Sequence, residues 1–255
     1  MPLDCRLIEE YLRSLNLDIV LPNIKLCVFE GVYPPKLDSF LVAQEITEVV
    51  REGDRILDIG AGSGILAILA AVKGAFAVAT DIDENSLSCA RYNATLNKVE
   101  LDVRLGSLFE PIEEGESFDI IVSNITSLPT PPNEKHDEYV TRTVDAGPDG
   151  RKYLEPLINQ MPKYLKEQGC FITLHSNFSD IERTESTLEN LGFSVELKLS
   201  EYPIGKTSAQ GIDYFLRSLP ANCYPIRKRG GVVPKNRDIQ SKEAIGCHNY
   251  LMLLI

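Results

Sequence analysis

The sequence predicts an α/β fold in which a mostly parallel sheet carries helices on both of its faces. Two observations support this prediction: short apolar segments alternate with helical segments between residues 55 and 199, and a glycine-rich run follows the first apolar segment. Alternation at this spacing implies right-handed crossovers, which place helices on either side of a parallel sheet. A chain of 255 residues can bury the core of such a fold. We find no convincing internal boundary, so we expect a single domain over residues 1–255.

The alternating pattern predicts a definite set of elements. Seven strands are expected, at residues 55–59, 76–81, 100–105, 118–123, 170–175, 194–199 and 250–255, with the last strand antiparallel. Helices are expected at residues 5–16, 39–50, 64–73, 84–97, 151–168 and 180–191. Residues 1–50 would form an N-terminal helical cap, and residues 200–246 an insertion rich in proline and glycine before the last strand. An insertion of this length usually forms a lid, a binding element or a partner surface.

Composition argues against several classes of protein. The formal net charge is −11, and the basic cluster between residues 227 and 237 is more typical of a solvated loop, so nucleic acid is disfavoured as a partner. The six cysteines form no CxxC pair and the three histidines have no metal-ligand spacing, which predicts no metal site and a reduced, cytoplasmic setting. The longest apolar stretch, residues 65–79, is interrupted by Lys73 and Gly74, and the N-terminal residues show no signal pattern. We therefore expect no membrane association.

A glycine-rich run lies at the junction between the first strand and its helix. Residues 57–64 read L-D-I-G-A-G-S-G, and glycine there permits positive φ and lets a ligand approach the backbone. The following helix exposes unpaired N–H groups to the crevice at the carboxyl ends of the strands. A dinucleotide loop of the form G-x-G-x-x-G/A is disfavoured, because Ile65 occupies its last place. A phosphate-binding P-loop is excluded, because no Gly-Lys-Ser/Thr follows.

Two acidic residues accompany the glycine run. Asp81 ends the second strand, where a carboxylate can accept hydrogen bonds from both ribose hydroxyls of a nucleoside. The alternative role of Asp81 is a second cap for the following helix, whose expected N-cap is Asp83. Asp58 ends the first strand and would brace the glycine loop, a role compatible with holding the amino group of a cofactor.

The pattern D-x-G-x-G-x-G, with an acid about 20 residues further on, resembles motif I of the class I S-adenosylmethionine-dependent methyltransferases. The resemblance implies a Rossmann-like fold with a seven-stranded sheet, and S-adenosyl-L-methionine as cofactor, with the glycine loop around its methionine part. The cofactor-binding residues that it implies are Asp58, Gly60, Ala61, Gly62, Gly64, Asp81, Ile82, Ser107, Leu108 and Asn124.

Four further segments resemble a narrower branch, the release-factor glutamine N5-methyltransferases and their "methyltransferase small domain" relatives. Residues 35–42, P-K-L-D-S-F-L-V, are similar to the branch's P-R-P-E-T-E-L-L, and residues 106–111, G-S-L-F-E-P, to its G-D-L-F-E-P. Residues 118–124, F-D-I-I-V-S-N, are similar to its F-D-l-I-v-S-N. Residues 144–150, V-D-A-G-P-D-G, resemble its A-L-x-G-G-x-D-G. The four segments occur in the order of that branch.

The segment after the fourth strand departs from the branch. The branch carries N-P-P-Y there, in which the asparagine holds a planar amide or amine nitrogen and the aromatic ring stacks on it. Residues 124–127 read N-I-T-S, so the aromatic is missing and Asn124 is the candidate catalytic residue, with a turn-forming asparagine as the alternative. Ser107 stands where the branch has an acid that contacts the adenine ring. Candidates for lining the acceptor pocket, or for ordinary packing, are Tyr33, Phe40 and Tyr139.

The sequence therefore predicts a methyltransferase that acts on a small molecule or on a protein side chain. Transfer from a sulfonium is an in-line displacement, so the protein mainly positions the acceptor, which contributes about 7–11 kcal/mol. Two alternatives stay open. One is a cofactor-binding protein without turnover, because N-P-P-Y has changed. The other is an RNA or DNA amine methyltransferase, which the net charge and the missing aromatic disfavour. The acceptor atom and the oligomeric state are open as well.

Overall fold

The structure, a computed structural model, describes residues 24–127, 129–130, 145–176, 178–202 and 247–254. Its strands are β1 (Arg55–Ile59), β2 (Phe76–Asp81), β3 (Asp102–Leu105), β4 (Phe118–Ser123), β5 (Leu165–Ser176), β6 (Val195–Tyr202) and β7 (Cys247–Leu254). Its helices are α2 (Leu37–Val49), α3 (Ile65–Val72), α4 (Glu84–Asn97), α6 (Leu154–Gln160), α7 (Ile181–Asn190) and the short 3-10 helix η1 (Met161–Lys163). The helix expected at residues 5–16 and residues 203–246 of the expected insertion lie outside the described residues.

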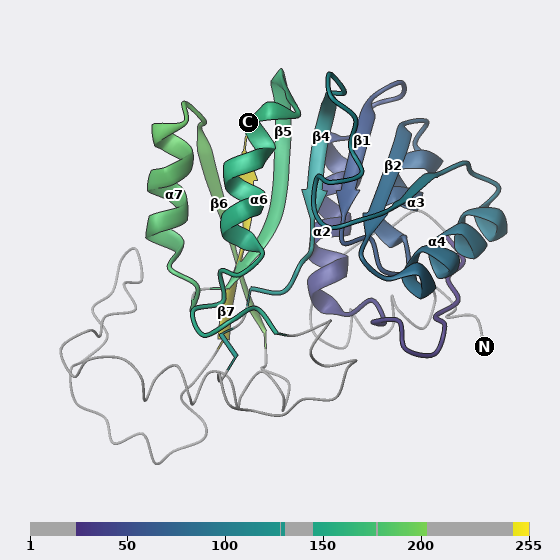
Figure 1. Ribbon diagram of the computed structural model, residues 1–255, viewed down its shortest axis with the longest axis horizontal. Coiled ribbons are helices and arrows are strands. Elements are labelled where there is room, and N and C mark those ends of the chain that lie inside the picture. Colours follow the sequence, from purple (N-terminus) through teal and green to yellow (C-terminus); the bar gives the residue numbers. More distant parts are fainter. Residues whose placement is uncertain (1–23, 128, 131–144, 177, 203–246, 255) are drawn as a thin grey trace, which may run out of the picture.

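Within the described residues, the strands form one sheet in the order β3-β2-β1-β4-β5-β7-β6 (Figure 1). β1 pairs in parallel with β2 and β4, and parallel pairing continues to β3 on one side and to β5 on the other. β7 runs antiparallel to both of its neighbours, β5 and β6, as predicted for the last strand. The α/β class and the mostly parallel sheet are confirmed.

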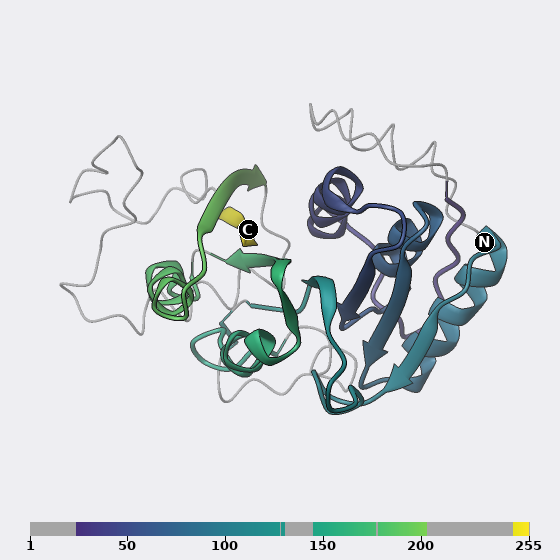
Figure 2. The same ribbon diagram turned by 90° about the horizontal axis from the view of Figure 1, so that it is seen from above.

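Two buried apolar clusters hold the helices to opposite faces of the sheet. In β1, Ile56 belongs to the cluster that includes α2 and α3, whereas Leu57 and Ile59 belong to the cluster that includes α6 and α7. Successive side chains of a strand point to opposite faces, so both faces of β1 are buried, as is usual in a parallel sheet. Figure 2 shows α2 on one side of the sheet and α6 and α7 on the other. The prediction of helices on both faces is confirmed.

One predicted helix is wrong. The sequence predicts a helix over residues 151–168, but α6 ends at Gln160 and β5 already begins at Leu165. Pro162 lies in the 3-10 turn between them, where it removes a backbone donor that a continuing helix would need. The polar residues 166–168 resemble the exposed face of a helix, yet they extend along the start of β5, where Leu165 pairs with Phe118 of β4. Sheet pairing thus overrides local helix propensity.

The other described elements differ from expectation only near their ends. β3 begins at Asp102 and β7 at Cys247, within three residues of the expected bounds. The shift in α2 matters more, because the helix begins at Leu37 and places Asp38 in its first turn. Among the helices of the described residues, none is both long and apolar enough to cross a bilayer.

Candidate active site

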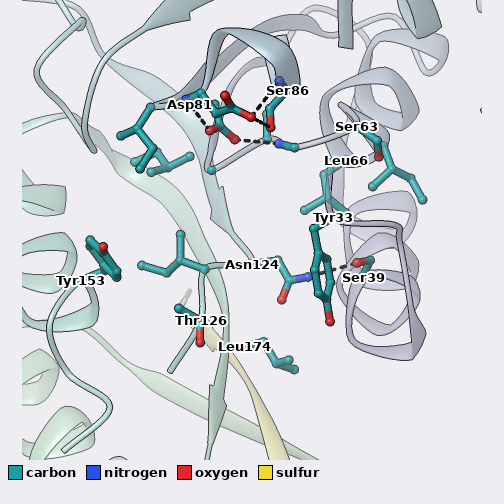
Figure 3. A pocket seen from close by; sticks show the side chains of 18 of the residues that line it. Tyr33, Ser39, Ser63, Leu66, Asp81, Ser86, Asn124, Thr126, Tyr153 and Leu174 are labelled. Carbon is teal, nitrogen blue, oxygen red and sulfur yellow. Dashed lines mark hydrogen bonds between the residues drawn. The ribbon is translucent and has the colours of Figure 1, made fainter. Parts of the chain in front are cut away.

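A pocket lies at the carboxyl ends of the parallel strands, where the loops after β1, β2, β3 and β4 meet the start of α2 (Figure 3). β1 and β4 are neighbours in the sheet, and the strands that follow them lie on opposite sides: β2 lies beyond β1, and β5 lies beyond β4. Ligands of open α/β sheets bind at such a switch point. Eight of the ten residues that the resemblance implies for the cofactor line this pocket: Gly60, Ala61, Gly62, Asp81, Ile82, Ser107, Leu108 and Asn124. The other two, Asp58 and Gly64, are not among its lining residues.

Asp58 and Gly64 hold the helix that follows the glycine loop. Asp58 is fully buried, and its Oδ2 accepts the N–H of Ala67 in α3 at 3.1 Å. Its Oδ1 has no hydrogen-bond partner among the described residues, and burial raises the pKa of the carboxyl to about 7. Gly64 is the N-cap of α3 at φ 81°, and a Cβ there would lie 2.8 Å from the Cβ of Ala90 in α4. Gly64 therefore serves the close packing of α3 against α4.

Asp81 ties the glycine loop to the end of β2. Its Oδ2 accepts the N–H of Gly62 at 2.9 Å, and its Oδ1 accepts the N–H of Asp83 at 3.0 Å. Asp83 is the N-cap of α4, as predicted, so the capping role is filled by Asp83 itself. Burial raises the pKa of Asp81. A carboxylate offers about four lone-pair sites, so Asp81 keeps acceptor capacity for the hydroxyl groups of a ligand.

The loop after β3 completes this side of the pocket. The N–H of Gly106 donates to the carbonyl of Asp81 at 3.0 Å, which fixes the loop beside the end of β2. Leu108 has φ 49°, an uncommon backbone conformation for leucine. Ile82, from the loop after β2, also lines the pocket and is 49% exposed. The structure thus brings Ile82, which follows β2, to the same pocket as Ser107 and Leu108, which both follow β3.

Asn124 reaches from the end of β4 to the first turn of α2. Its Nδ2 donates to Ser39 Oγ at 3.2 Å (Figure 3). At the outer limit of a hydrogen bond, the same nitrogen lies 3.5 Å from Asp38 Oδ2. Asp38 lines the pocket, and burial raises its pKa. Asp38 and Ser39 were not predicted as site residues, although both lie in the segment 35–42 that resembles the methyltransferase branch. The helix expected at residues 39–50 leaves Asp38 just before its first residue, and no local pattern marks this acid as one that faces a ligand.

Aromatic side chains reach the pocket, but from segments other than the loop after β4. Tyr33 lines the pocket, and the Lys36 ammonium lies 4.5 Å from the centroid of its ring. Tyr153, which was not predicted, also lines the pocket. Phe40 is only 3% exposed and belongs to the apolar core, so it is a packing residue. Tyr139 lies outside the described residues.

A turn at residues 145–150 holds the loop after β4 in place. The N–H of Thr130 donates to the carbonyl of Gly147 at 2.8 Å. Gly150 has φ 72°, and a Cβ there would collide with the carbonyl oxygen of Ser127. Ser127, which stands in the fourth place of the changed N-P-P-Y segment, is buried, and its Oγ accepts the N–H of Ser176 at 3.1 Å. Ser127 also lines the pocket, but it offers no aromatic ring and its hydroxyl is bonded to the backbone of β5.

Comparison with known proteins decides the family. The family model described as ribosomal protein L11 methyltransferase (PrmA) matches residues 40–130. A Methanocaldococcus jannaschii protein, provisionally named protein N5-glutamine methyltransferase, is 36% identical over 180 residues, which cover 70% of this chain and 89% of the relative. The chain belongs to the class I S-adenosylmethionine-dependent methyltransferases. It falls in the branch that the segments between residues 35 and 150 resemble.

Two further proteins resemble this methyltransferase. The release factor glutamine methyltransferase of Fusobacterium nucleatum is 27% identical over 190 residues, which cover 68% of this chain and 51% of the relative. This chain thus spans about half of that relative. The solved E. cuniculi Mtq2-Trm112 complex shares the fold, with a TM-score of 0.57 at 14% identity, covering 88% of this chain and 98% of that one.

S-adenosyl-L-methionine is the cofactor of this methyltransferase. The pocket fits such a molecule on two observations. Asp81 keeps lone pairs for hydroxyl groups after it has bound Gly62 and Asp83. A Cβ at Gly62 would meet nothing within 4 Å, so the loop leaves open space in front of its backbone. Among the residues that the structure describes, no group of three or more His, Cys, Asp or Glu side chains is arranged to hold a metal ion.

Proposed function

We propose that this methyltransferase transfers a methyl group to the side-chain amide nitrogen of a glutamine in a protein. The relatives from M. jannaschii and F. nucleatum are both named as glutamine methyltransferases. The E. cuniculi complex is described as responsible for the methylation of the eRF1 translation termination factor. The observation in this chain that carries the proposal is Asn124, because its amide is anchored through Nδ2 and its carbonyl oxygen is left to accept an N–H.

In the cofactor half of the pocket, each residue group that the resemblance implies has a proposed role. S-adenosylmethionine supplies a methyl group on a sulfonium. The Asp81 carboxylate would accept the ribose hydroxyls, because it is the acid at the end of β2 and its remaining lone pairs are unused by the loop. Ile82, Ser107 and Leu108 would hold the adenine ring, and the backbone of residues 60–62 the methionine part. Asp58 would support that loop from behind, as would Gly64.

The acceptor half has to orient a weak nucleophile. A glutamine amide nitrogen carries two N–H groups, and the Asn124 carbonyl oxygen would accept one of them. The amide nitrogen gains positive charge as its new bond to carbon forms, so its N–H becomes a stronger donor. The hydrogen bond to Asn124 therefore strengthens toward the transition state, which lowers the barrier without tightening the ground state. As the N–C bond forms, the S–C bond of the sulfonium would break and S-adenosylhomocysteine would be the leaving group. The extra proton on nitrogen would then pass to water, so a strong base is not required.

Tyr33 and Tyr153 are the proposed replacements for the missing aromatic. Both line the pocket, one from the segment before α2 and the other from the residue before α6. An aromatic face suits a planar amide, whose flat surface makes dispersion contacts with the ring. Ser127 has no such role, because its hydroxyl is committed to the backbone of β5.

A labelled-methyl assay tests the proposed function. The chain is incubated with methyl-labelled S-adenosylmethionine and separate protein, RNA and small-molecule fractions of a cell extract. We expect label in the protein fraction that is released as methylamine on acid hydrolysis, because hydrolysis of an N-methyl amide frees its amine. Asn124→Ala should remove this label. Asn159→Ala, an exposed position on α6, should retain it. Label confined to RNA or small molecules, or protein label that yields no methylamine, contradicts the proposal.

A further inference from the structure

Asp38 is a partly buried carboxylate, and the described part of the fold leaves one of its two oxygens enclosed without a partner. It lies in the first turn of α2 and lines the pocket, yet its Oδ1 is closed off from solvent and has no hydrogen-bond partner among the described residues. An acid in the first turn favours a helix, but an exposed acid does so equally well. The Ser39 N–H and the charge of Lys36 favour the ionised carboxyl, but the desolvation of the enclosed Oδ1 has no compensating hydrogen bond within the described residues. The position of Asp38 therefore calls for a role other than stabilising α2.

The side chain that Asp38 contacts is Asn124. Its Oδ2 lies 3.5 Å from Asn124 Nδ2, and Ser39 Oγ lies 3.2 Å from the same nitrogen. Figure 3 shows the amide nitrogen of Asn124 directed at Ser39 and the carbonyl oxygen directed away from it. Both contacts come from the start of α2, about 85 residues earlier in the chain. The first turn of α2 thus fixes one end of the Asn124 amide and leaves the other end to the pocket.

The chemistry of the two partners decides which end of the amide faces α2. A side-chain amide has a donor end and an acceptor end of nearly equal shape, so packing alone does not choose between them. The Ser39 hydroxyl both donates and accepts, and is compatible with either choice. Burial raises the pKa of Asp38, but the Ser39 N–H and the charge of Lys36 act in the opposite direction and favour its ionised form. An ionised carboxylate only accepts, so in that form Asp38 takes the Nδ2 end. Its charge also polarises the amide, which makes the carbonyl oxygen a better acceptor.

We propose that Asp38 is a positioning residue that holds the Asn124 amide with its carbonyl oxygen toward the methyl acceptor, so that the site selects acceptors that donate an N–H. The inference rests on the proposed function. If the Asn124 amide were flipped, its NH2 group would face the N–H of an amide acceptor. Both groups are donors, so neither would have a hydrogen-bond partner. A carboxylate acceptor carries no hydrogen to donate, so the held orientation also disfavours methylation on oxygen.

The state of the Asn124 amide can be measured without any acceptor. We would record the side-chain NH2 signals of protein labelled with ¹⁵N-asparagine and saturated with S-adenosylhomocysteine, and assign Asn124 as the pair missing from Asn124→Asp. We expect one Asn124 proton shifted downfield and exchanging slowly with water. In Asp38→Ala that shift should be lost, and exchange should be about tenfold faster or more. Glu48→Ala, an exposed acid on the same helix, should leave both signals unchanged.

Kinetics of the same variants completes the test. In Asp38→Ala we expect kcat to fall by about tenfold or more, with the Kd for S-adenosylhomocysteine within about threefold of the original. Asp38→Asn keeps an oxygen that can accept from Nδ2 but not the charge, so its kcat should lie between the two. It also serves as the test where Asp38→Ala fails to fold.

Two results would overturn the proposal. One is unchanged Asn124 signals together with unchanged kcat in both Asp38 variants. The other is a cofactor affinity that falls about tenfold while kcat is kept, because Asp38 would then bind the cofactor instead. The proposed function can fail separately: a chain that leaves protein glutamine unmethylated refutes that function, while the Asn124 signals still decide the role of Asp38.

Discussion

The two halves of the pocket are assembled from different distances along the chain. In the cofactor half, the loops after β1 and β2 bind each other, and Gly62 and Asp81 are only 19 residues apart. In the acceptor half, Asn124 is held by Ser39, 85 residues away, and the loop around Ser127 is held by Gly147 and Gly150 from the other side. The cofactor half is thus a local construction, whereas the acceptor half depends on several distant segments. Changes at a distance are expected to alter the acceptor half first.

The largest expected effect is a loss of stability, and it should differ between one glycine of each half. Gly150 and Gly62 both have positive φ, at 72° and 54°, but a Cβ at Gly150 meets backbone whereas a Cβ at Gly62 meets nothing within 4 Å. Gly150→Ala should lower the free energy of unfolding by about 3 kcal/mol or more, because overpacking adds to backbone strain. Gly62→Ala should cost about 1–2 kcal/mol, from strain alone. Urea denaturation measures both, and equal losses would contradict the comparison.

The next prediction separates the halves by function. Asn124→Ala should lower kcat about 100-fold, since it removes a hydrogen bond that strengthens in the transition state. The Kd for S-adenosylhomocysteine should stay within about threefold of the original, because the local cofactor half is intact. Turnover assays and calorimetric titration give the two numbers. A collapse of cofactor binding would show that Asn124 is a scaffold residue.

The reverse pattern is expected at Asp81. Asp81→Ala removes charge-assisted hydrogen bonds worth about 1.5–3 kcal/mol each, so cofactor binding should weaken at least about tenfold. Glu100→Ala, an exposed acid before β3, is the control and should bind as the original does. Calorimetry measures the affinity, and circular dichroism checks that the variant is folded. Unchanged affinity in a folded variant would leave Asp81 only its role in tying the glycine loop.

The smallest expected effect is on the pH dependence of the free energy of unfolding. Burial raises the pKa of Asp58, in the cofactor half, to about 7, and lowers that of His175, at the end of β5, to about 4. The stability that Asp58 contributes is present below its unfolded pKa of about 3.9 and is lost as the pH rises through about 7. The contribution of His175 is present above about 6.5 and is lost as the pH falls through about 4.

Replacing these two groups should therefore change the pH dependence of the free energy of unfolding in opposite directions. Relative to the original chain, Asp58→Asn should gain stability as the pH rises from 4.5 to 7.5, and His175→Gln should lose it. Each slope is at most about 1.4 kcal/mol per pH unit. Urea unfolding at three pH values measures the slopes. Curves parallel to that of the original chain would show that the two groups titrate in the folded state as they do in the unfolded one.

The local character of the cofactor half explains why the sequence was sufficient to predict much of it. The glycine run, the acid at the end of β2 and the cap at Asp83 are each defined by residues within one loop, and the alternation of strands and helices places those loops side by side. Asp58 and Gly64 belong to the same motif, but they lie behind the loop. Spacing along the chain cannot separate a residue that faces a ligand from one that packs behind it.

The acceptor half could be predicted only in part, for the opposite reason. Asn124 was found because it stands in the first place of the branch's N-P-P-Y motif, directly after a clear strand. Asp38 and Tyr153 instead reach the pocket through the packing of α2 and of the turn before α6. No local pattern records such contacts. The prediction of a helix over residues 151–168 was wrong for the same reason, because a contact with a distant segment decides the structure. The last residues of that range begin β5 instead, where Leu165 pairs with Phe118 of a neighbouring strand that lies 47 residues earlier in the sequence.

The place of β7 between β5 and β6 bears on how the chain folds. In the sheet, Leu251 pairs with Leu174 of β5 on one side and with Lys198 of β6 on the other. A ribosome therefore releases β6 before the strand that links it to the sheet exists, and β5 remains an open edge until residues 247–254 emerge. Pairings across such sequence separation form slowly, and an uncovered edge strand invites association with other chains. Nascent-chain folding should accordingly complete in one late step that joins both strands at once.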